Sequence, residues 1–154
     1  ADNLKISGAG VWHTQLHFTS DKRYGGGIVF GHNSNGIELS NLYMDSNLTS
    51  RYNEDAQYKA ISGTLGKDSK IHDIWVQHFE VGMWIGDYDQ TGNMKYTDGL
   101  VVENARIRNN LADGINFAQG TKNSTVKNSN IRGNGDDGLG EDTSIPFRWY
   151  KCRS

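Results

Sequence analysis

Three aspartates in the C-terminal third of the chain have the side chains that acid–base chemistry requires. Asp136 and Asp137 are adjacent, and they follow Asp113 by 23 and 24 residues. Splitting a glycosidic bond needs one carboxyl group that donates a proton and another that activates water, both within reach of one sugar ring. The residue types therefore predict a polysaccharide hydrolase, provided that the fold brings these three side chains together.

An internal repeat supplies a reason why they should meet. Asn41, Asp73, Asn104 and Asn128 follow one another at steps of 32, 31 and 24 residues. Each is followed three positions later by an apolar residue, and these residues are Met44, Val76, Ile107 and Ile131. Asparagine and aspartate tolerate the left-handed backbone of a tight corner, so we expect one repeated corner along the chain.

A second set of anchors keeps the same spacing. Gly82, Gly114 and Gly138 lie 32 and 24 residues apart, and each is followed by an apolar residue. A period of this size with several short strands per repeat is typical of stacked coils that bury one continuous apolar column. Two independent registers therefore predict the same stacking of coils.

The fold class follows from the strand pattern and the composition. Short alternating apolar and polar segments are bounded by Gly, Asn, Asp and Ser, and the chain has 19 glycines but one proline. We predict an all-β fold, a right-handed parallel β-helix that forms a partial solenoid. Residues 46–66 and 89–98 are expected to be loops around a groove. An antiparallel β-sandwich is the alternative that short strands with Gly/Asn turns leave open.

This stacking places the acids together. If Asn104 lies over Asn128, then Asp113 lies over Asp137, and adjacent strands are ~4.8 Å apart. Like charges held this close oppose ionisation of the whole group, which keeps a proton available for catalysis. The alternative is that Asp-Gly and Asp-Asp-Gly are only turn signals or a cation site.

Other residues are candidates for contact with substrate. Asp87 and Asp89 follow the Gly82 anchor and should project near the acids one coil earlier, where they could hold sugar hydroxyls; a polar turn is the alternative. Trp12, Trp75 and Trp84 could stack on sugar rings, although tryptophans buried in the core fit the same pattern. Trp84 is the strongest of the three because Asp87 follows it closely.

Several function classes are disfavoured. The formal net charge is −2 with scattered Lys and Arg, so we expect neither nucleic acid nor membrane as a partner. Apolar runs are far shorter than the ~20 residues of a membrane helix. The five histidines lack metal-ligand spacing and the chain has one cysteine, so we expect no metal and no cofactor.

The stretches around the acids resemble the catalytic β-helix of glycoside hydrolase family 87, the bacterial α-1,3-glucanases (mutanases) and mycodextranases. The main stretches are LADGINFAQG (residues 111–120) and NGDDGL (134–139). Upstream stretches that fit the same family are ISGAGVWHT (6–14), SRYN (50–53), KIHD (70–73) and WIGDY (84–88). The resemblance covers residues 1–139, and the acids are also similar to those of dextranases and, more distantly, polygalacturonases.

The resemblance implies a secreted, endo-acting hydrolase of α-1,3-glucan that works by inversion. Asp136 would be the general acid, and Asp113 with Asp137 would hold the attacking water. Asn116 and Gln119, in the same stretch, are expected to contact substrate. The chain opens at Ala1 without a signal-peptide pattern, so an export signal is not expected within it.

Residues 140–154 depart from the family pattern and contain the only proline and the only cysteine. We predict a β-helix module at residues 1–139 and an atypical tail outside the repeat at 140–154. Complete catalytic domains of the family are several times longer, so the module is expected to be partial, with uncapped ends that can self-associate. Three alternatives remain: a fragment that binds polysaccharide without cleaving it, a dextranase-like hydrolase, and a calcium-dependent lyase.

Overall fold

The computed structural model describes residues 2–20, 26–51, 58–88, 94–95, 97–118, 121–141, 148–149 and 152–153. Within these ranges the secondary structure consists of strands, with no helix, and no helix able to cross a bilayer is found there. Every recorded strand pair is parallel except one short antiparallel pair. The predicted all-β class and parallel pairing are confirmed, and this pairing excludes an antiparallel sandwich.

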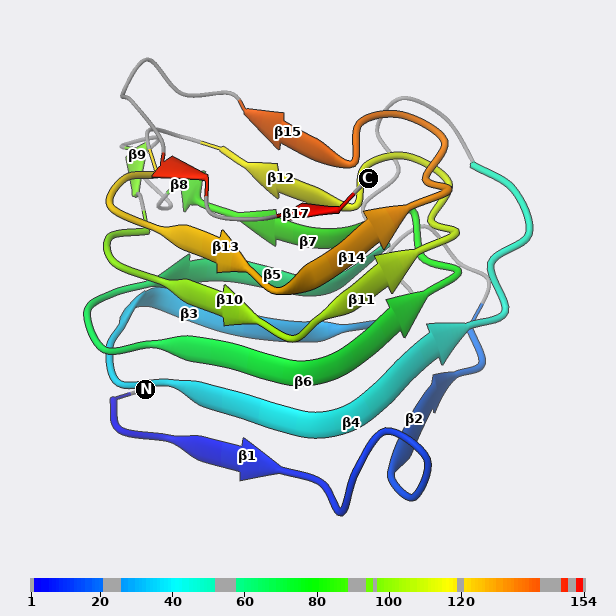
Figure 1. Ribbon diagram of the computed structural model, residues 1–154, viewed down its shortest axis with the longest axis horizontal. Coiled ribbons are helices and arrows are strands. Elements are labelled where there is room, and N and C mark those ends of the chain that lie inside the picture. The colour runs from blue at the N-terminus through cyan, green and yellow to red at the C-terminus, as the bar shows by residue number, and fades with distance from the viewer. Residues whose placement is uncertain are drawn as a thin grey trace.

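The strands form two large sheets, stacked coil upon coil (Figure 1). The first sheet contains β1 (Lys5–Ser7), β2 (Gln15–Phe18), β4 (Glu38–Ser46), β6 (Lys70–Gln77), β10 (Val101–Glu103), β11 (Arg106–Arg108), β13 (Thr125–Lys127), β14 (Ser129–Arg132), β16 (Arg148–Trp149) and β17 (Cys152–Arg153). The second contains β3 (Ile28–Ser34), β5 (Lys59–Leu65), β7 (Val81–Ile85), β12 (Ile115–Phe117) and β15 (Leu139–Glu141). The antiparallel pair is β8 (Asp87–Tyr88) with β9 (Met94–Lys95). The chain alternates between the two large sheets, which is consistent with a β-helix-like fold.

The corner predicted from the first register is present. Asn41, Asp73, Asn104 and Asn128 all have positive φ, between 50° and 57°. The Asn104 side-chain amide donates to the Asp73 carboxylate across 3.3 Å, which links two successive corners. These residues therefore turn the first sheet at the same place in every coil, because Asn and Asp adopt the left-handed region more readily than other side-chain-bearing residues.

Buried apolar columns run through the interior. Met44 pairs with Val76, Val76 with Ile107, and Ile107 with Ile131. The second sheet adds a column of Ile61, Met83, Ile115 and Leu139. The first three members of this second column are fully buried, and Leu139 packs partly buried against the core. Burial of these columns at about 25 cal/mol per Å² is the main stabilising term that holds the coils in register.

Two expectations about connecting segments differ from the structure. The expected loop at residues 46–66 contains β5, whose Ala60 and Ile61 are fully buried, so that expectation is wrong for residues 59–65. The apolar residues of this segment supply the strand that links β3 to β7 in the second sheet. Short strands also occur within residues 140–154, where β16 pairs with β13 and β17 with β14.

Candidate active site

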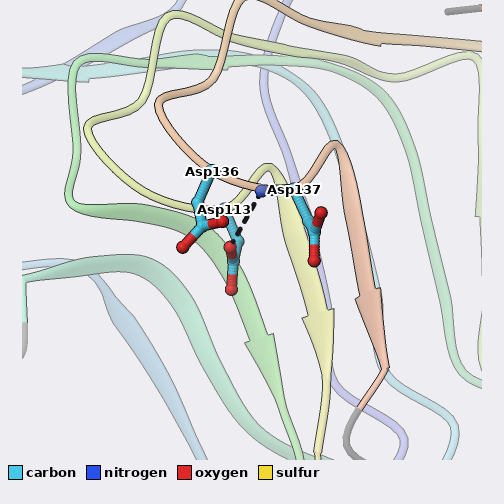
Figure 2. Close-up of side chains that lie close together, drawn as sticks. All are labelled: Asp113, Asp136 and Asp137. Atoms are coloured by element: carbon cyan, nitrogen blue, oxygen red, sulfur yellow. Dashed lines mark hydrogen bonds between the residues drawn. The ribbon is translucent and has the colours of Figure 1, made fainter.

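The three aspartates meet at the turn that leads into the second sheet. Asp113 precedes β12, and Asp136 and Asp137 precede β15, the next strand of that sheet. Figure 2 shows their carboxylates gathered from these two adjacent coils. One carboxylate oxygen from each residue lies within 4.8 Å of the others. The predicted register is therefore confirmed, and it brings the trio together.

Glycines set the distance between these coils. The Gly114 N–H donates to the Asp137 carbonyl across 2.9 Å, and the Ile115 N–H donates to the Gly138 carbonyl across 3.0 Å. A Cβ on Gly114 would lie 2.5 Å from the Gly138 carbonyl oxygen, too close for any side-chain-bearing residue to fit without a shift. The glycine after each acid thus permits the close approach that puts Asp113 beside Asp137.

Asparagines support the same turn one step earlier. The Asn110 side-chain amide donates to Oδ1 of Asn134 across 3.0 Å, and Oδ1 of Asn110 accepts from the Phe79 N–H across 3.1 Å. Asn110 and Asn134 each lie three residues before an aspartate of the trio, 24 residues apart. The sequence analysis missed this pair, although its spacing equals the repeat and could have revealed it.

Asp113 is the most firmly held of the three acids. Only 9% of its surface is exposed, while Asp136 and Asp137 are exposed. Its Oδ2 accepts a 2.7 Å hydrogen bond from the Asn116 side-chain amide. Its Oδ1 accepts a 3.3 Å hydrogen bond from the Asp137 N–H (Figure 2). Both partners are donors, so the Asp113 oxygens act as acceptors, which suits a carboxylate that orients water.

Asn116 lies beside the trio, as expected, but its recorded contact is to Asp113. It pairs with Trp84 on one side and with Gly140 on the other. A Cβ on Gly140 would lie 3.0 Å from Nδ2 of Asn116 and 3.5 Å from Oδ2 of Asp113. Gly140 therefore leaves room for the Asn116–Asp113 hydrogen bond. No repeat or motif marked Gly140 in the sequence.

Trp84 occupies the coil below Asn116 and is half-buried. The Lys59 ammonium lies 4.2 Å from the centroid of the Trp84 ring. The ring therefore already makes a cation–π contact with one face, as the negative face of an aromatic ring favours. Trp84 is close enough to the trio through Asn116 to remain a candidate for substrate contact.

The other predicted contact residues are only partly described. Asp87 belongs to the short strand β8, and its side chain lies outside the described part of the structure. Asp89 and Gln119 lie outside the described residues. Trp12 and Trp75 belong to the region of β4 and β6 on the first sheet rather than to the coils that carry the trio.

The same three carboxylates have the chemistry of a cation site. Hard cations such as Ca²⁺ and Mg²⁺ take carboxylate oxygens as ligands, and the three oxygens are close enough to share one ion. Two of the four lone-pair directions of Asp113 are engaged by the Asn116 amide and the Asp137 N–H. The geometry therefore allows both acid–base chemistry and cation binding.

A family model decides the affiliation. Residues 1–146 match the family described as the alpha-1,3-glucanase catalytic domain D2. The chain belongs to this family. The expected family resemblance is therefore confirmed, while a comparison with curated proteins gave no match.

Solved structures agree with this assignment. The crystal structure of the Agl-KA catalytic domain is 55% identical with a TM-score of 0.86, over 93% of this chain and 24% of that one. The catalytic unit of a thermostable GH87 alpha-1,3-glucanase from Streptomyces thermodiastaticus strain HF3-3 is 27% identical with a TM-score of 0.72, over 93% and 24%. The chain thus spans about a quarter of the length of these relatives.

A GH87 alpha-1,3-glucanase catalytic domain in complex with nigerose is 27% identical with a TM-score of 0.69, over 89% of this chain and 23% of that one. Single aspartate-to-alanine variants of a GH87 alpha-1,3-glucanase, in complex with nigerose or tetrasaccharides, match at 25% to 26% identity. Saccharides are therefore bound by structures whose fold this chain shares over most of its length.

Proposed function

We propose that this chain carries the acid–base site of an endo-acting α-1,3-glucan hydrolase. The observation that carries the proposal is the cluster of Asp113, Asp136 and Asp137 on two adjacent coils, with oxygens within 4.8 Å of one another. Family membership supplies the substrate class, because the matched family is that of alpha-1,3-glucanase catalytic domains.

The spacing of the trio supports the assignment of these residues. In the GH87 aspartate-to-alanine variants, the second and third substituted positions follow the first by 23 and 24 residues. Asp136 and Asp137 follow Asp113 by the same 23 and 24 residues. Substituting aspartates at that spacing in complexes with saccharides is what a study of catalytic acids would require.

We assign Asp136 as the general acid, because it is exposed toward the side from which a sugar must approach. Asp113 and Asp137 then hold and deprotonate the attacking water. Asp113 is suited to this task by its two hydrogen-bond donors, which fix both of its oxygens. Asp137 lies directly beside it, held through its own N–H.

The expected stereochemical outcome is inversion. Two carboxyl groups of an inverting pair usually lie ~6.5–9.5 Å apart, and those of a retaining pair ~5–5.5 Å apart. The oxygens here approach within 4.8 Å, and we attribute that short approach to the two carboxylates that share one water. Inversion of an α-linkage releases the β-anomer first. Proton NMR of the first product distinguishes this result from retention, which would release the α-anomer.

The same register supports the finer description of the fold. We infer that the coils form a right-handed parallel β-helix, because crossovers between parallel strands of one sheet are right-handed in ~98% of cases. We also propose that the protein is secreted, since an insoluble polymer must be attacked outside the cell.

Substrate choice tests the proposed function. The chain is incubated with insoluble α-1,3-glucan, with dextran and with polygalacturonate, and reducing ends are counted. Release from α-1,3-glucan alone supports the proposal. Release from dextran would favour a dextranase-like hydrolase, and an unsaturated product from polygalacturonate that depends on calcium would favour a lyase.

A further inference from the structure

A second cluster of aromatic side chains lies away from the aspartates, on the first sheet. Trp12 is 67% exposed and meets Trp75 edge to face, with 5.3 Å between the ring centroids and 89° between the planes. Tyr43 meets Trp75 in the same manner at 5.3 Å and 63°. Three rings from the segment before β2, from β4 and from β6 thus gather on one surface.

Hydrogen bonds fix these rings in place. Nε1 of Trp75 donates to Oε1 of Gln77 across 3.0 Å, and the Gln77 amide donates to the Tyr43 hydroxyl across 2.7 Å. The Tyr43 hydroxyl in turn donates to Asp45 across 2.9 Å. Burial and the neighbouring Asp45 carboxylate raise the pKa of Tyr43 to about 12, so it remains a donor at neutral pH. A chain of this kind positions the rings before any ligand arrives.

Two adjoining hollows open beside Trp12. The smaller, of about 230 Å³, is lined by Trp12, Tyr43, Trp75 and Gln15. The larger, of about 400 Å³, shares Val11 and Trp12 with it and falls within the ~300–1,000 Å³ range of small-ligand sites. Its other walls carry the corner residues Asn41, Asp73 and Asn104, together with Arg106.

This combination of groups matches one ligand class. A flat, exposed indole offers a platform for the apolar face of a sugar ring. The amides of Gln15, Asn41 and Asn104 both donate and accept hydrogen bonds, as sugar hydroxyls do. Asp73 and Arg106 have opposite charges, so the surface has no excess charge that would select a nucleic acid or an acidic polymer.

We propose that the hollow around Trp12 and Trp75 is a second saccharide-binding site, which holds a stretch of glucan away from the acids. The identity of the polymer rests on the proposed function, but the binding of a neutral saccharide does not. Figure 1 shows β4 and β6 in the coils nearer the N-terminus, while the acids precede β12 and β15 of the other sheet. A second contact raises the effective concentration of an insoluble polymer at the chain.

Fluorine NMR of the chain labelled with 5-fluorotryptophan tests this site, because each tryptophan gives its own signal. The Asp136→Asn variant is used so that the saccharides are not consumed. Titration with α-1,3-linked gluco-oligosaccharides is expected to shift the Trp12 and Trp75 signals along one binding curve. Trp12→Ala is expected to weaken that curve on the order of tenfold, which corresponds to loss of one stacking contact.

Val29→Ala is the matched control. Val29 is a large exposed apolar residue, 73% exposed on β3 of the other sheet, and its removal should leave the curve unchanged. The proposal is overturned if the Trp12 and Trp75 signals do not move, or if Trp12→Ala leaves the affinity unchanged. Displacement of these signals only by a protein partner would also overturn it.

The outcomes remain separable from those of the proposed function. Shifts of Trp12 and Trp75 by saccharide, in a chain that releases no sugar from any polymer, would retain this site and remove the catalytic proposal. Sugar release that is lost in the Asp136→Asn variant, together with unmoved Trp12 and Trp75 signals, would do the reverse.

Discussion

The backbone N–H of Asp137 donates a hydrogen bond to Oδ1 of Asp113 across 3.3 Å, between two adjacent coils. This contact exists because the chain places an Asp-Gly dipeptide on both coils at a step of 24 residues. One acid is thereby fixed by the backbone of the residue that carries another. Geometry at the trio therefore depends on how closely the two coils stack.

Asn116 is expected to position Asp113 through its 2.7 Å hydrogen bond. Asn116→Ala should lower kcat on the order of 10²-fold, the size of effect that misplacement by about 1 Å can produce, with a smaller change in KM. The pH profile of kcat should also move, because the amide no longer stabilises the Asp113 carboxylate.

Asn123→Ala is a matched control, since Asn123 is exposed and its amide donates to Asp98 at a different corner. Activity in that variant should remain as in the wild type. An Asn116→Ala variant in which only KM changes would show that Asn116 contacts substrate and does not position the acid.

Gly114 is expected to be essential for the spacing of the coils. A methyl group there would meet the Gly138 carbonyl oxygen and Cγ2 of Ile131, each at 2.5 Å. Gly114→Ala should lower the free energy of unfolding by about 1–3 kcal/mol, as overpacking usually does, and should also lower kcat. Urea denaturation followed by circular dichroism measures the first effect.

The comparison variant is Gly31→Ala, since nothing lies within 4 Å of a Cβ built on Gly31. Its stability should change by no more than about 0.5 kcal/mol. Equal destabilisation of both variants would mean that the close stacking at Gly114 is not what matters.

Arg51 is expected to stabilise the fold in a pH-dependent way. Its guanidinium lies 3.3 Å from the nearly buried carboxylate of Glu80, which also accepts from the Tyr58 N–H. Burial raises the pKa of Glu80, and the Arg51 charge opposes that rise. Because the folded-state pKa is raised, Glu80 lowers stability as pH rises from the ordinary glutamate range through that raised value.

Arg51→Ala removes the opposing charge and raises the pKa of Glu80 further. The variant should lose about 1–3 kcal/mol at neutral pH, less than the ~3–5 kcal/mol of a fully buried pair, because the Arg51 side chain is 45% exposed. The difference from wild type should shrink in acid, where Glu80 is protonated in both. A loss of the same size at pH 4 and pH 7 would contradict the role of this ion pair.

The trio is expected to act without a metal ion. Hydrolysis of α-1,3-glucan should continue at the wild-type rate after treatment with EDTA and gel filtration, because proton donation and water activation are assigned to the carboxylates themselves. Recovery of a lost activity by Ca²⁺ or Mg²⁺, but not by buffer alone, would instead identify the oxygens as ligands.

Much of the fold could be predicted because repetition reveals register. The positions of Asn41, Asp73, Asn104 and Asn128 predicted the corner, and all four have positive φ. The β5 strand at residues 59–65 was missed, because the coil that contains it breaks the spacing on which the registers depend. Local pattern alone gave no reason to place that strand in the second sheet.

The site could be predicted only in part. The meeting of Asp113, Asp136 and Asp137 follows from the repeat. The hydrogen bond from Asn116 to Asp113 does not, since it depends on a side-chain rotamer and on the space that Gly140 leaves. The pairing of Lys59 with Trp84 likewise depends on a strand that the repeat did not reveal.

One measurement tests the central claim most directly, namely reducing-end release from insoluble α-1,3-glucan by the chain and by its Asp136→Asn and Asp137→Asn variants. Circular dichroism and urea denaturation first establish that all three are folded. The account predicts release by the wild type and none by either variant. Equal release by either variant, or no release by the folded wild type, would contradict it.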